Sequence, residues 1–325
     1  MPQFYAKRPA PIDQEQWLAQ AQATGYSLAL TELLQYRLQP SSKLRAPKTN
    51  QARGRGGNQL SKSKGRGMEF DEVRHYQSGD DIRAIDWRVT ARTGQTHTKL
   101  YREEKERPTF IFVDLSPSMH FGSRLLFKSV QACHLAAVLA WRAVRRGDRV
   151  GGLVYSGQRH HEIKPMARDK GVLRLLQTLV TIHGSASDET SVSGRSDDFL
   201  RNLQRLRQLV KTGAHVILIS DFHHLTEACV RDLRSLRQHN WVQAMLVTDP
   251  MELVLPDSPL TKVQAIDDEF TREFWLGDTR TATLYQRQAA DWLTQRQALM
   301  AKAGISSALI DAGTPIASQW EALGL

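Results

Sequence analysis

The stretch TFIFVDLSPSM, residues 109–119, decides the fold that we expect for this chain. Its first half is a run of β-branched and aromatic residues, which is typical of a buried strand, and Asp114 then begins a polar turn. A long amphipathic helix is predicted from about residue 123 to residue 146. The run HVILIS, residues 215–220, has the continuous apolar character of a strand covered on both faces of a parallel sheet.

Outward from these two runs, strands alternate with helices almost to the end of the chain. We expect further strands at 149–155, 162–166, 242–248, 262–266 and 306–310, and further helices at 170–182, 197–211, 226–239 and 281–303. Such alternation implies right-handed crossovers in a doubly wound, mostly parallel sheet. The sequence therefore predicts an α/β domain over residues 108–325.

Three different segments precede this domain. Residues 1–40 carry apolar side chains at helical spacing and predict a helical lead-in. Residues 41–67 are rich in Gly, Ser, Lys and Arg and almost free of apolar side chains, which predicts a basic flexible loop. Residues 68–107 mix apolar and charged side chains, and 95–104 partly alternate as a strand does, so we expect a small strand-rich lobe.

The charge of the chain is concentrated in the basic loop. The sequence of 325 residues has 44 Lys+Arg against 34 Asp+Glu, a net charge of +10, and no acid lies between Glu32 and Glu69. The loop contains a basic patch of Arg45, Lys48, Arg53, Arg55, Lys62, Lys64 and Arg66. Clustered bases bind polyanions, so a nucleic-acid or anionic-surface protein is an alternative function. A solvated loop is the favoured interpretation, because no aromatic residue is interleaved for base stacking.

Cysteine content and hydropathy favour a cytoplasmic protein. The chain has only Cys133 and Cys229, which excludes a disulfide framework and a zinc or redox site of the C-x-x-C type. The N-terminal residues lack the apolar core of a signal peptide, and Lys128, His134 and Arg142 interrupt the most apolar helix. We expect no transmembrane segment, although peripheral contact with an anionic membrane stays open.

Polar side chains follow the two most apolar strands. Asp114, Ser116 and Ser118 come after the first, Asp221 comes after HVILIS, and a polar loop at 187–195 precedes the next helix. Ligands of doubly wound sheets bind outside the carboxyl ends of the strands. Carboxylates and hydroxyls in one crevice suit a hard divalent cation, with Mg²⁺ as the expected ion and Mn²⁺ or Ca²⁺ as alternatives.

The spacing Asp-x-Ser-x-Ser at a strand-to-helix turn resembles the metal-ion-dependent adhesion site (MIDAS) of von Willebrand factor A domains. The resemblance implies that Asp114, Ser116, Ser118 and Asp221 hold the cation, with a threonine from a later loop. Thr190 is the candidate, and Ser187 and Ser191 are its rivals, because this chain reads Ser-Asp-Glu-Thr-Ser-Val-Ser where family members often show Gly-x-Thr.

A second resemblance covers residues 25–250 and is most specific in 65–119. That stretch contains Gly-x-Glu-Phe, Arg-x-Tyr-x-x-Gly-Asp-Asp-x-Arg, Ile-Asp-Trp and Thr-Ala-Arg, followed by a Glu-Glu pair before the first strand. It is similar to the signature of the domain of unknown function fifty-eight family. The resemblance implies a metal-dependent adaptor that partners a MoxR-type AAA+ ATPase and an unidentified client protein in protein maturation or a stress response.

The signature residues themselves predict a structural network. Carboxylates and guanidiniums in comparable numbers usually form ion pairs, and the tryptophans are expected in the core or an interface, with the core favoured. The predicted network consists of Glu69, Arg74, Asp80, Asp81, Arg83, Asp86, Trp87 and Arg92. We expect no enzyme, because the chain has neither Gly-x-Ser-x-Gly nor a Gly-x-x-x-x-Gly-Lys-[Ser/Thr] loop.

Overall fold

The computed structural model describes residues 13–38, 68–103, 107–157, 159–186, 196–266 and 271–323. The chain divides into two compact units, one formed by 1–47 with 107–325 and the other by 48–106. The predicted mixed α/β architecture with a mostly parallel central sheet is confirmed in the larger unit.

A six-stranded sheet of order β10-β7-β6-β3-β4-β5 forms the larger unit. Its strands are β3 (Pro108–Asp114), β4 (Arg149–Ser156), β5 (Arg159–Met166), β6 (His215–Ser220), β7 (Trp241–Thr248) and β10 (Ser306–Asp311). All neighbours pair in parallel except the edge strand β5, which runs antiparallel to β4. The chain goes outward from β3 through β4 to β5 and then returns to β6 on the other side of β3. The order therefore reverses between β3 and β6.

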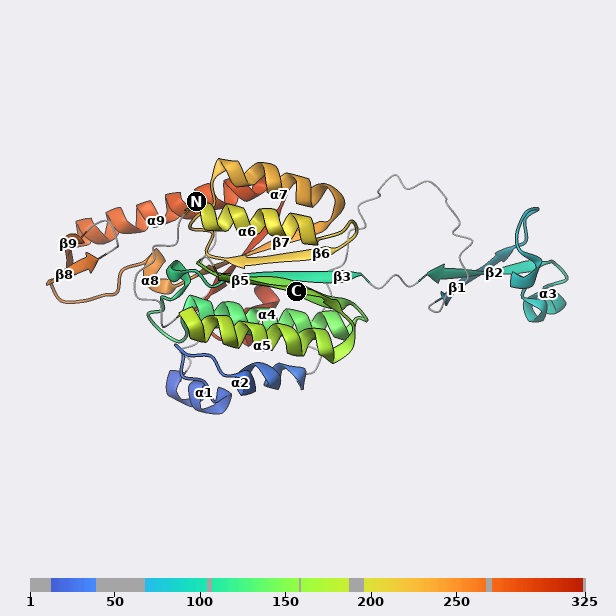
Figure 1. The fold of residues 1–325 in the computed structure, drawn as a ribbon, viewed down its shortest axis with the longest axis horizontal. Helices are drawn as coiled ribbons and strands as arrows, with labels where there is room; N and C mark the ends of the chain where they lie inside the picture. The colour runs from blue at the N-terminus through green and yellow to red at the C-terminus, as the bar shows by residue number, and fades with distance from the viewer. Residues whose placement is uncertain are drawn as a thin grey trace. The chain divides into compact units, whose positions relative to one another are not determined.

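Helices cover both faces of this sheet (Figure 1). One face carries α4 (Lys128–Arg145) and α5 (Arg168–Ala186), and the other carries α6 (Ser196–Leu209), α7 (Glu227–His239) and α9 (Thr279–Lys302). The lead-in elements α1 (Gln14–Ala21), α2 (Leu30–Leu34) and η1 (Gln35–Arg37) lie outside α4 and α5. The short α8 (Pro250–Leu253) follows β7, and α10 (Ile316–Leu323) follows β10.

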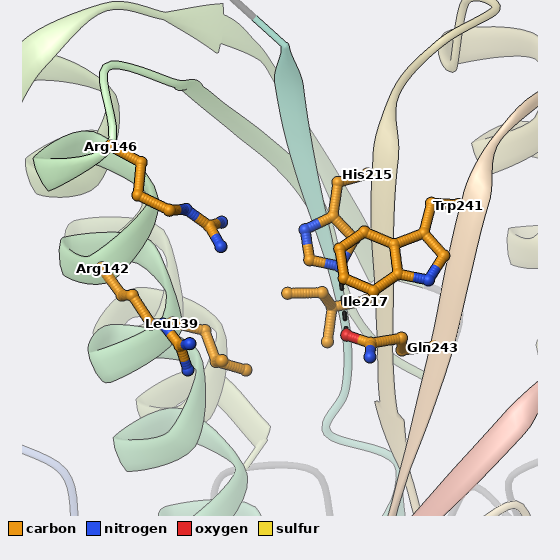
Figure 2. Close-up of a pocket in the computed structure, with 7 residues that line it drawn as sticks. All are labelled: Leu139, Arg142, Arg146, His215, Ile217, Trp241 and Gln243. Atoms are coloured by element: carbon orange, nitrogen blue, oxygen red, sulfur yellow. Dashed lines mark hydrogen bonds between the residues drawn. The ribbon is translucent and has the colours of Figure 1, made fainter. Parts of the chain in front are cut away.

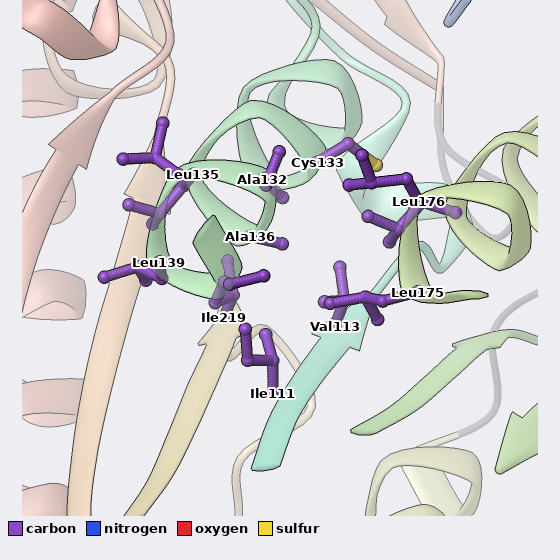
Figure 3. Close-up of a cluster of buried hydrophobic side chains, with 14 of the residues drawn as sticks. Ile111, Val113, Ala132, Cys133, Leu135, Ala136, Leu139, Leu175, Leu176 and Ile219 are labelled. Atoms are coloured by element: carbon purple, nitrogen blue, oxygen red, sulfur yellow. The ribbon is translucent and has the colours of Figure 1, made fainter. Parts of the chain in front are cut away.

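The core is split by the sheet because successive strand residues point to opposite faces. Ile111 and Val113 of β3 pack with Ala136 of α4 and Leu175 of α5, as Figure 3 shows. Phe110 and Phe112 of the same strand belong to the second buried cluster, below α6, α7 and α9. The central strands are thus buried on both faces, as their continuous apolar sequence predicts.

The lead-in is fixed to α4 by a buried cluster of three polar side chains. The hydroxyl of Tyr36 lies 2.6 Å from Nδ1 of His134, and Nε2 of that ring lies 3.3 Å from a carboxylate oxygen of Glu32. All three side chains are almost fully buried. Burial, together with the Glu32 charge, raises the pKa of Tyr36.

Two elements differ from the sequence prediction. The helix expected from residue 123 begins at Lys128, because both the backbone N–H and the hydroxyl of Ser123 donate to the Asp249 carboxylate, at 2.8 and 2.5 Å. The predicted strand at 262–266 exists as β8 (Thr261–Ile266), but it pairs only with β9 (Thr271–Leu276), in a separate hairpin outside the main sheet.

The smaller unit is built on an antiparallel pair, β1 (Met68–His75) with β2 (His97–Glu103), as expected of a strand-rich lobe. Between these strands lie η3 (Ile82–Ala84) and α3 (Trp87–Thr93). Asp80 accepts from Arg74 at 2.7 Å, and Asp86 caps α3 and lies 3.5 Å from Lys99. Part of the predicted network is thus present.

The other members of the predicted network are not joined by ion pairs among the described residues. Trp87 is 66% exposed rather than buried, and Arg83 and Arg92 are exposed with no carboxylate partner among the residues that the structure describes. Asp81 uses its carboxylate to cap η3, at the backbone N–H of Arg83. The physical reason is size, since a two-stranded lobe with one short helix has too little interior to enclose a tryptophan. The side chain of Glu69 lies outside the described part.

Candidate metal centre

Asp114 and Asp221 stand at the point where the strand order reverses. Asp114 is the last residue of β3 and Asp221 follows β6 directly, and the two strands are paired neighbours. Their side chains are 1% and 2% exposed. The two predicted carboxylates therefore meet in the crevice where doubly wound sheets bind their ligands.

Asp114 is held by hydrogen bonds but has no cation beside it in the described structure. Its Oδ1 accepts from the backbone N–H of Ser116 at 2.9 Å, and its Oδ2 accepts from the Ser220 hydroxyl at 2.6 Å. Burial and the negative charge of Asp221 raise the pKa of Asp114 above its ordinary value. An added positive charge would stabilise the ionised form of this carboxyl group.

Asp221 lies in a contrasting environment. Its Oδ2 accepts from the ammonium of Lys128 at 2.9 Å, and its Oδ1 accepts from the backbone N–H of His223 at 2.9 Å. Burial by itself raises the pKa of Asp221, but the Lys128 charge and these hydrogen bonds, with another from Ser118, outweigh burial and hold that pKa below its ordinary value. The ionised form is therefore favoured more at Asp221 than at Asp114.

The two serines complete an oxygen-rich turn. Ser116 precedes the short helix η4 (Pro117–Met119), and its hydroxyl lies 3.3 Å from that of Ser118. Ser116 is buried, whereas Ser118 is partly exposed and lies on the solvent side. The backbone after Asp221 is strained, because Phe222 has a φ of +53°, a conformation that is costly for an aromatic residue and is common at functional sites.

The remaining predicted ligands come from the loop before α6. Thr190 and its rivals Ser187 and Ser191 lie outside the described residues. The same holds for the basic patch, whose seven members all fall in the part of the chain from 39 to 67.

Three functional residues were missed by sequence reasoning. Ser220 is the last residue of β6, and its hydroxyl links Asp114 to the turn after Asp221, where it accepts from the N–H of Phe222 at 2.8 Å. Lys128 begins α4, and its ammonium donates to Asp221 and, at 2.5 Å, to Glu252. Glu252 belongs to α8, 124 residues further along the chain. A lysine at the start of an otherwise apolar helix was the available signal.

The donors that meet here fit a hard divalent cation. They are carboxylate and hydroxyl oxygens, the ligands that Mg²⁺ prefers while keeping several of its waters. When the side chains of Asp114, Asp221, Glu252 and Lys128 are all ionised, their net charge is −2. One divalent cation balances that charge. Within the described ranges, no three His, Cys, Asp or Glu side chains are arranged to hold a metal ion together. The candidate centre thus depends on two carboxylates with hydroxyls and water.

A separate cavity lies at the opposite end of the sheet (Figure 2). It has a volume of about 10 Å³, room for one water molecule, and lies between α4 and the first residues of β6 and β7. Its lining includes Arg142, Arg146 and His215, whose ring stacks on Trp241 with centroids 4.3 Å apart. Burial, with the nearby guanidiniums, lowers the pKa of His215 to about 4. This cavity is too small for an organic ligand.

Comparison with known proteins identifies the family. The sequence pattern of the family described as "Protein of unknown function DUF58" matches residues 72–295. The chain belongs to the DUF58 family. Among bacterial relatives of this DUF58 protein, uncharacterized protein Rv1480 of Mycobacterium tuberculosis is 30% identical over 218 residues, 67% of either chain. Uncharacterized protein YeaD of Bacillus subtilis is 28% identical over 155 residues, 48% of this chain and 36% of YeaD.

Two solved structures are distant neighbours of the DUF58 protein. BatB from Bacteroides thetaiotaomicron, a conserved hypothetical protein, is 13% identical with a TM-score of 0.40, over 67% of this chain and 95% of BatB. An aerotolerance-related membrane protein from Bacteroides fragilis is 14% identical with a TM-score of 0.41, over 66% and 96% of the two chains. In the described part of this DUF58 chain, no helix combines the length and apolar character needed to cross a bilayer.

Proposed function

We propose that this DUF58 protein is a non-enzymatic, divalent-metal-dependent protein-binding module with a fold of the von Willebrand factor A type. The observation that carries the proposal is the meeting of Asp114 and Asp221 with the hydroxyls of Ser116 and Ser118 where the strand order reverses. The antiparallel edge strand β5 beside an otherwise parallel sheet is compatible with that fold type.

The proposed mechanism needs only ligand exchange at the crevice. When bound, a divalent cation supplies a coordination position that a carboxylate of a partner protein can fill. Asp114, Asp221 and Ser116 would hold the cation from the buried side, and the partly exposed Ser118 would hold it from the side that a partner can reach. Binding of the partner then requires metal, because without the cation the site offers no coordination position for a partner carboxylate.

The expected partner is a MoxR-type AAA+ ATPase, with an unidentified client protein as the second. This part of the proposal comes from what the family resemblance implies. We place the protein in the cytoplasm, and the two buried, unpaired cysteines, Cys133 and Cys229, are consistent with a reducing compartment. Mg²⁺ is the proposed ion, since oxygen donors and retained waters suit it.

The test compares the wild type with Asp114→Ala on an affinity matrix. A lysate of the source cell is passed over each in Mg²⁺ and in chelator, and Asp291→Ala on the exposed face of α9 serves as the matched acidic control. We expect the wild type and the control to retain an AAA+ ATPase in Mg²⁺ only. Asp114→Ala is expected to retain none in either condition, although the circular dichroism spectrum of this variant stays native. Equal retention by Asp114→Ala or in chelator contradicts the proposal.

A second candidate function is binding of nucleic acid or another polyanion through the basic loop. One observation favours it: Trp87, an aromatic side chain able to stack, is exposed, and so are Arg83 and Arg88 in the same compact unit. The retention experiment separates the two functions. Nucleic acid retained at low salt, lost at high salt and indifferent to chelator supports the second candidate instead.

A further inference from the structure

Lys128 occupies a position that is unfavourable for a lysine by itself. It is the first residue of the 18-residue helix α4, at the positive end of the helix dipole, and its side chain is 2% exposed. Burial of an ammonium is costly and lowers its pKa, but the carboxylates of Asp221 and Glu252 outweigh burial and raise the pKa of Lys128. These two carboxylates therefore explain why a charged ammonium is stable at this buried position.

The two carboxylates that bind Lys128 differ in their other roles. Asp221 is a proposed metal ligand. Its Oδ1 accepts from the backbone N–H of His223, and its other oxygen, Oδ2, accepts from the Lys128 ammonium. Glu252 is partly exposed, and its second oxygen accepts from the backbone N–H of Asp249 at 2.9 Å, in the capping box of α8. Glu252 is thus fixed in place independently of Asp221.

A divalent cation bound at Asp221 and the ammonium in its present position repel each other. The lysine stem is flexible and has a second fixed partner in Glu252, so the ammonium can leave Asp221 without losing every counter-charge. We infer that Lys128 is an exchangeable cation within the protein, an inference that rests on the metal-dependent function proposed above. The Lys128 ammonium neutralises Asp221 in the metal-free protein and is displaced towards Glu252 when a divalent cation binds.

This exchange sets which ions the crevice accepts. A monovalent ion brings to Asp221 no more charge than the ammonium already supplies. Replacing the ammonium with such an ion therefore gains no electrostatic stabilisation. A divalent ion neutralises Asp221 and Asp114 together and replaces one positive charge with two. Lys128 therefore lowers the affinity for every metal ion, but it excludes Na⁺ and K⁺ far more effectively than Mg²⁺ or Mn²⁺.

The test is the affinity of the purified full chain for MgCl₂ and MnCl₂, measured by isothermal titration calorimetry with Lys128→Met and Lys128→Arg. We expect Lys128→Met to bind Mg²⁺ at least tenfold more tightly than the wild type, and Lys128→Arg, which keeps the charge, to show no gain. Lys302→Met is the matched control, because Lys302 also pairs with a carboxylate, that of Glu227, but in a solvent-exposed ion pair that includes none of the proposed metal ligands. Its affinity is expected to equal that of the wild type.

Thermal melting supplies a second readout. The metal-free melting temperature of Lys128→Met is expected below that of the wild type, with a larger rise on addition of Mg²⁺. Should Lys128→Met fail to fold, Lys128→Gln retains a hydrogen-bond donor to Asp221 and takes its place.

Equal or weaker Mg²⁺ affinity in the folded Met or Gln variant overturns the inference and leaves the metal-dependent function standing. Absence of Mg²⁺ and Mn²⁺ binding in the wild type and in every variant overturns both.

Discussion

Replacing Asp221 with asparagine is expected to lower the free energy of unfolding by about 3 kcal/mol in the absence of divalent metal. The substitution preserves the size of the side chain and removes its charge, so the buried ammonium of Lys128 keeps only the partly exposed Glu252 as a counter-charge. Breaking a buried ion pair by removing one partner is costly because the other charge stays dehydrated. Urea denaturation in chelator, followed by circular dichroism, measures the change.

Asp114→Asn is the matched control for that prediction. Asp114 is as deeply buried as Asp221, but burial and the Asp221 charge raise the pKa of its carboxyl group and thus disfavour its ionised form. A neutral amide of the same size is expected to cost at most about 1 kcal/mol, since removing the charge also removes the repulsion between the two groups. Equal destabilisation by the two asparagine variants contradicts this assignment of charge within the crevice.

Replacing Gly152 with alanine is expected to destabilise the fold by about 3 kcal/mol or to prevent folding. Gly152 of β4 is paired in register with Ile111 of β3 in the centre of the sheet. An added Cβ would overlap the carbonyl oxygen of Ile111, and neither strand can move aside because both are packed between helix layers. Thermal unfolding and the yield of soluble protein measure the effect.

Gly184→Ala provides the comparison within the same chain. Gly184 lies in α5, and a Cβ there meets no atom within 4 Å. Alanine is the better helix former by up to about 1 kcal/mol, so this variant is expected to be unchanged or slightly more stable. The same large loss in both variants would contradict the steric explanation for Gly152.

The fold was largely predictable because its strands carry an unambiguous signal. The runs 110–113 and 216–219 are apolar throughout, which is the pattern typical of strands buried on both faces. Once the sheet is mostly parallel, the residues after these strands must lie at one edge, so Asp114 and Asp221 were predictable as neighbours. The register itself and the separate β8–β9 hairpin depend on packing between distant segments, which single-segment patterns do not contain.

The parts that escaped prediction share one cause. Lys128 begins an otherwise apolar helix, and its role depends on Asp221 and Glu252, which are far away in the sequence but bind its ammonium. Trp87 was expected in the core or an interface, with the core favoured because tryptophan is usually well buried, but burial also requires a large enough surrounding unit. Each of these residues takes its role from its neighbours in space rather than from those in the sequence.

The most direct test of the metal centre is a crystal structure of the protein grown with Mn²⁺, with an anomalous difference map calculated at the manganese edge. The account predicts one strong peak in the crevice formed by Asp114, Ser116, Ser118 and Asp221, and no peak there in crystals of Asp114→Ala. A map of the wild type at saturating Mn²⁺ without a peak in that crevice, or with Lys128 still bound to Asp221 and manganese elsewhere, would contradict it.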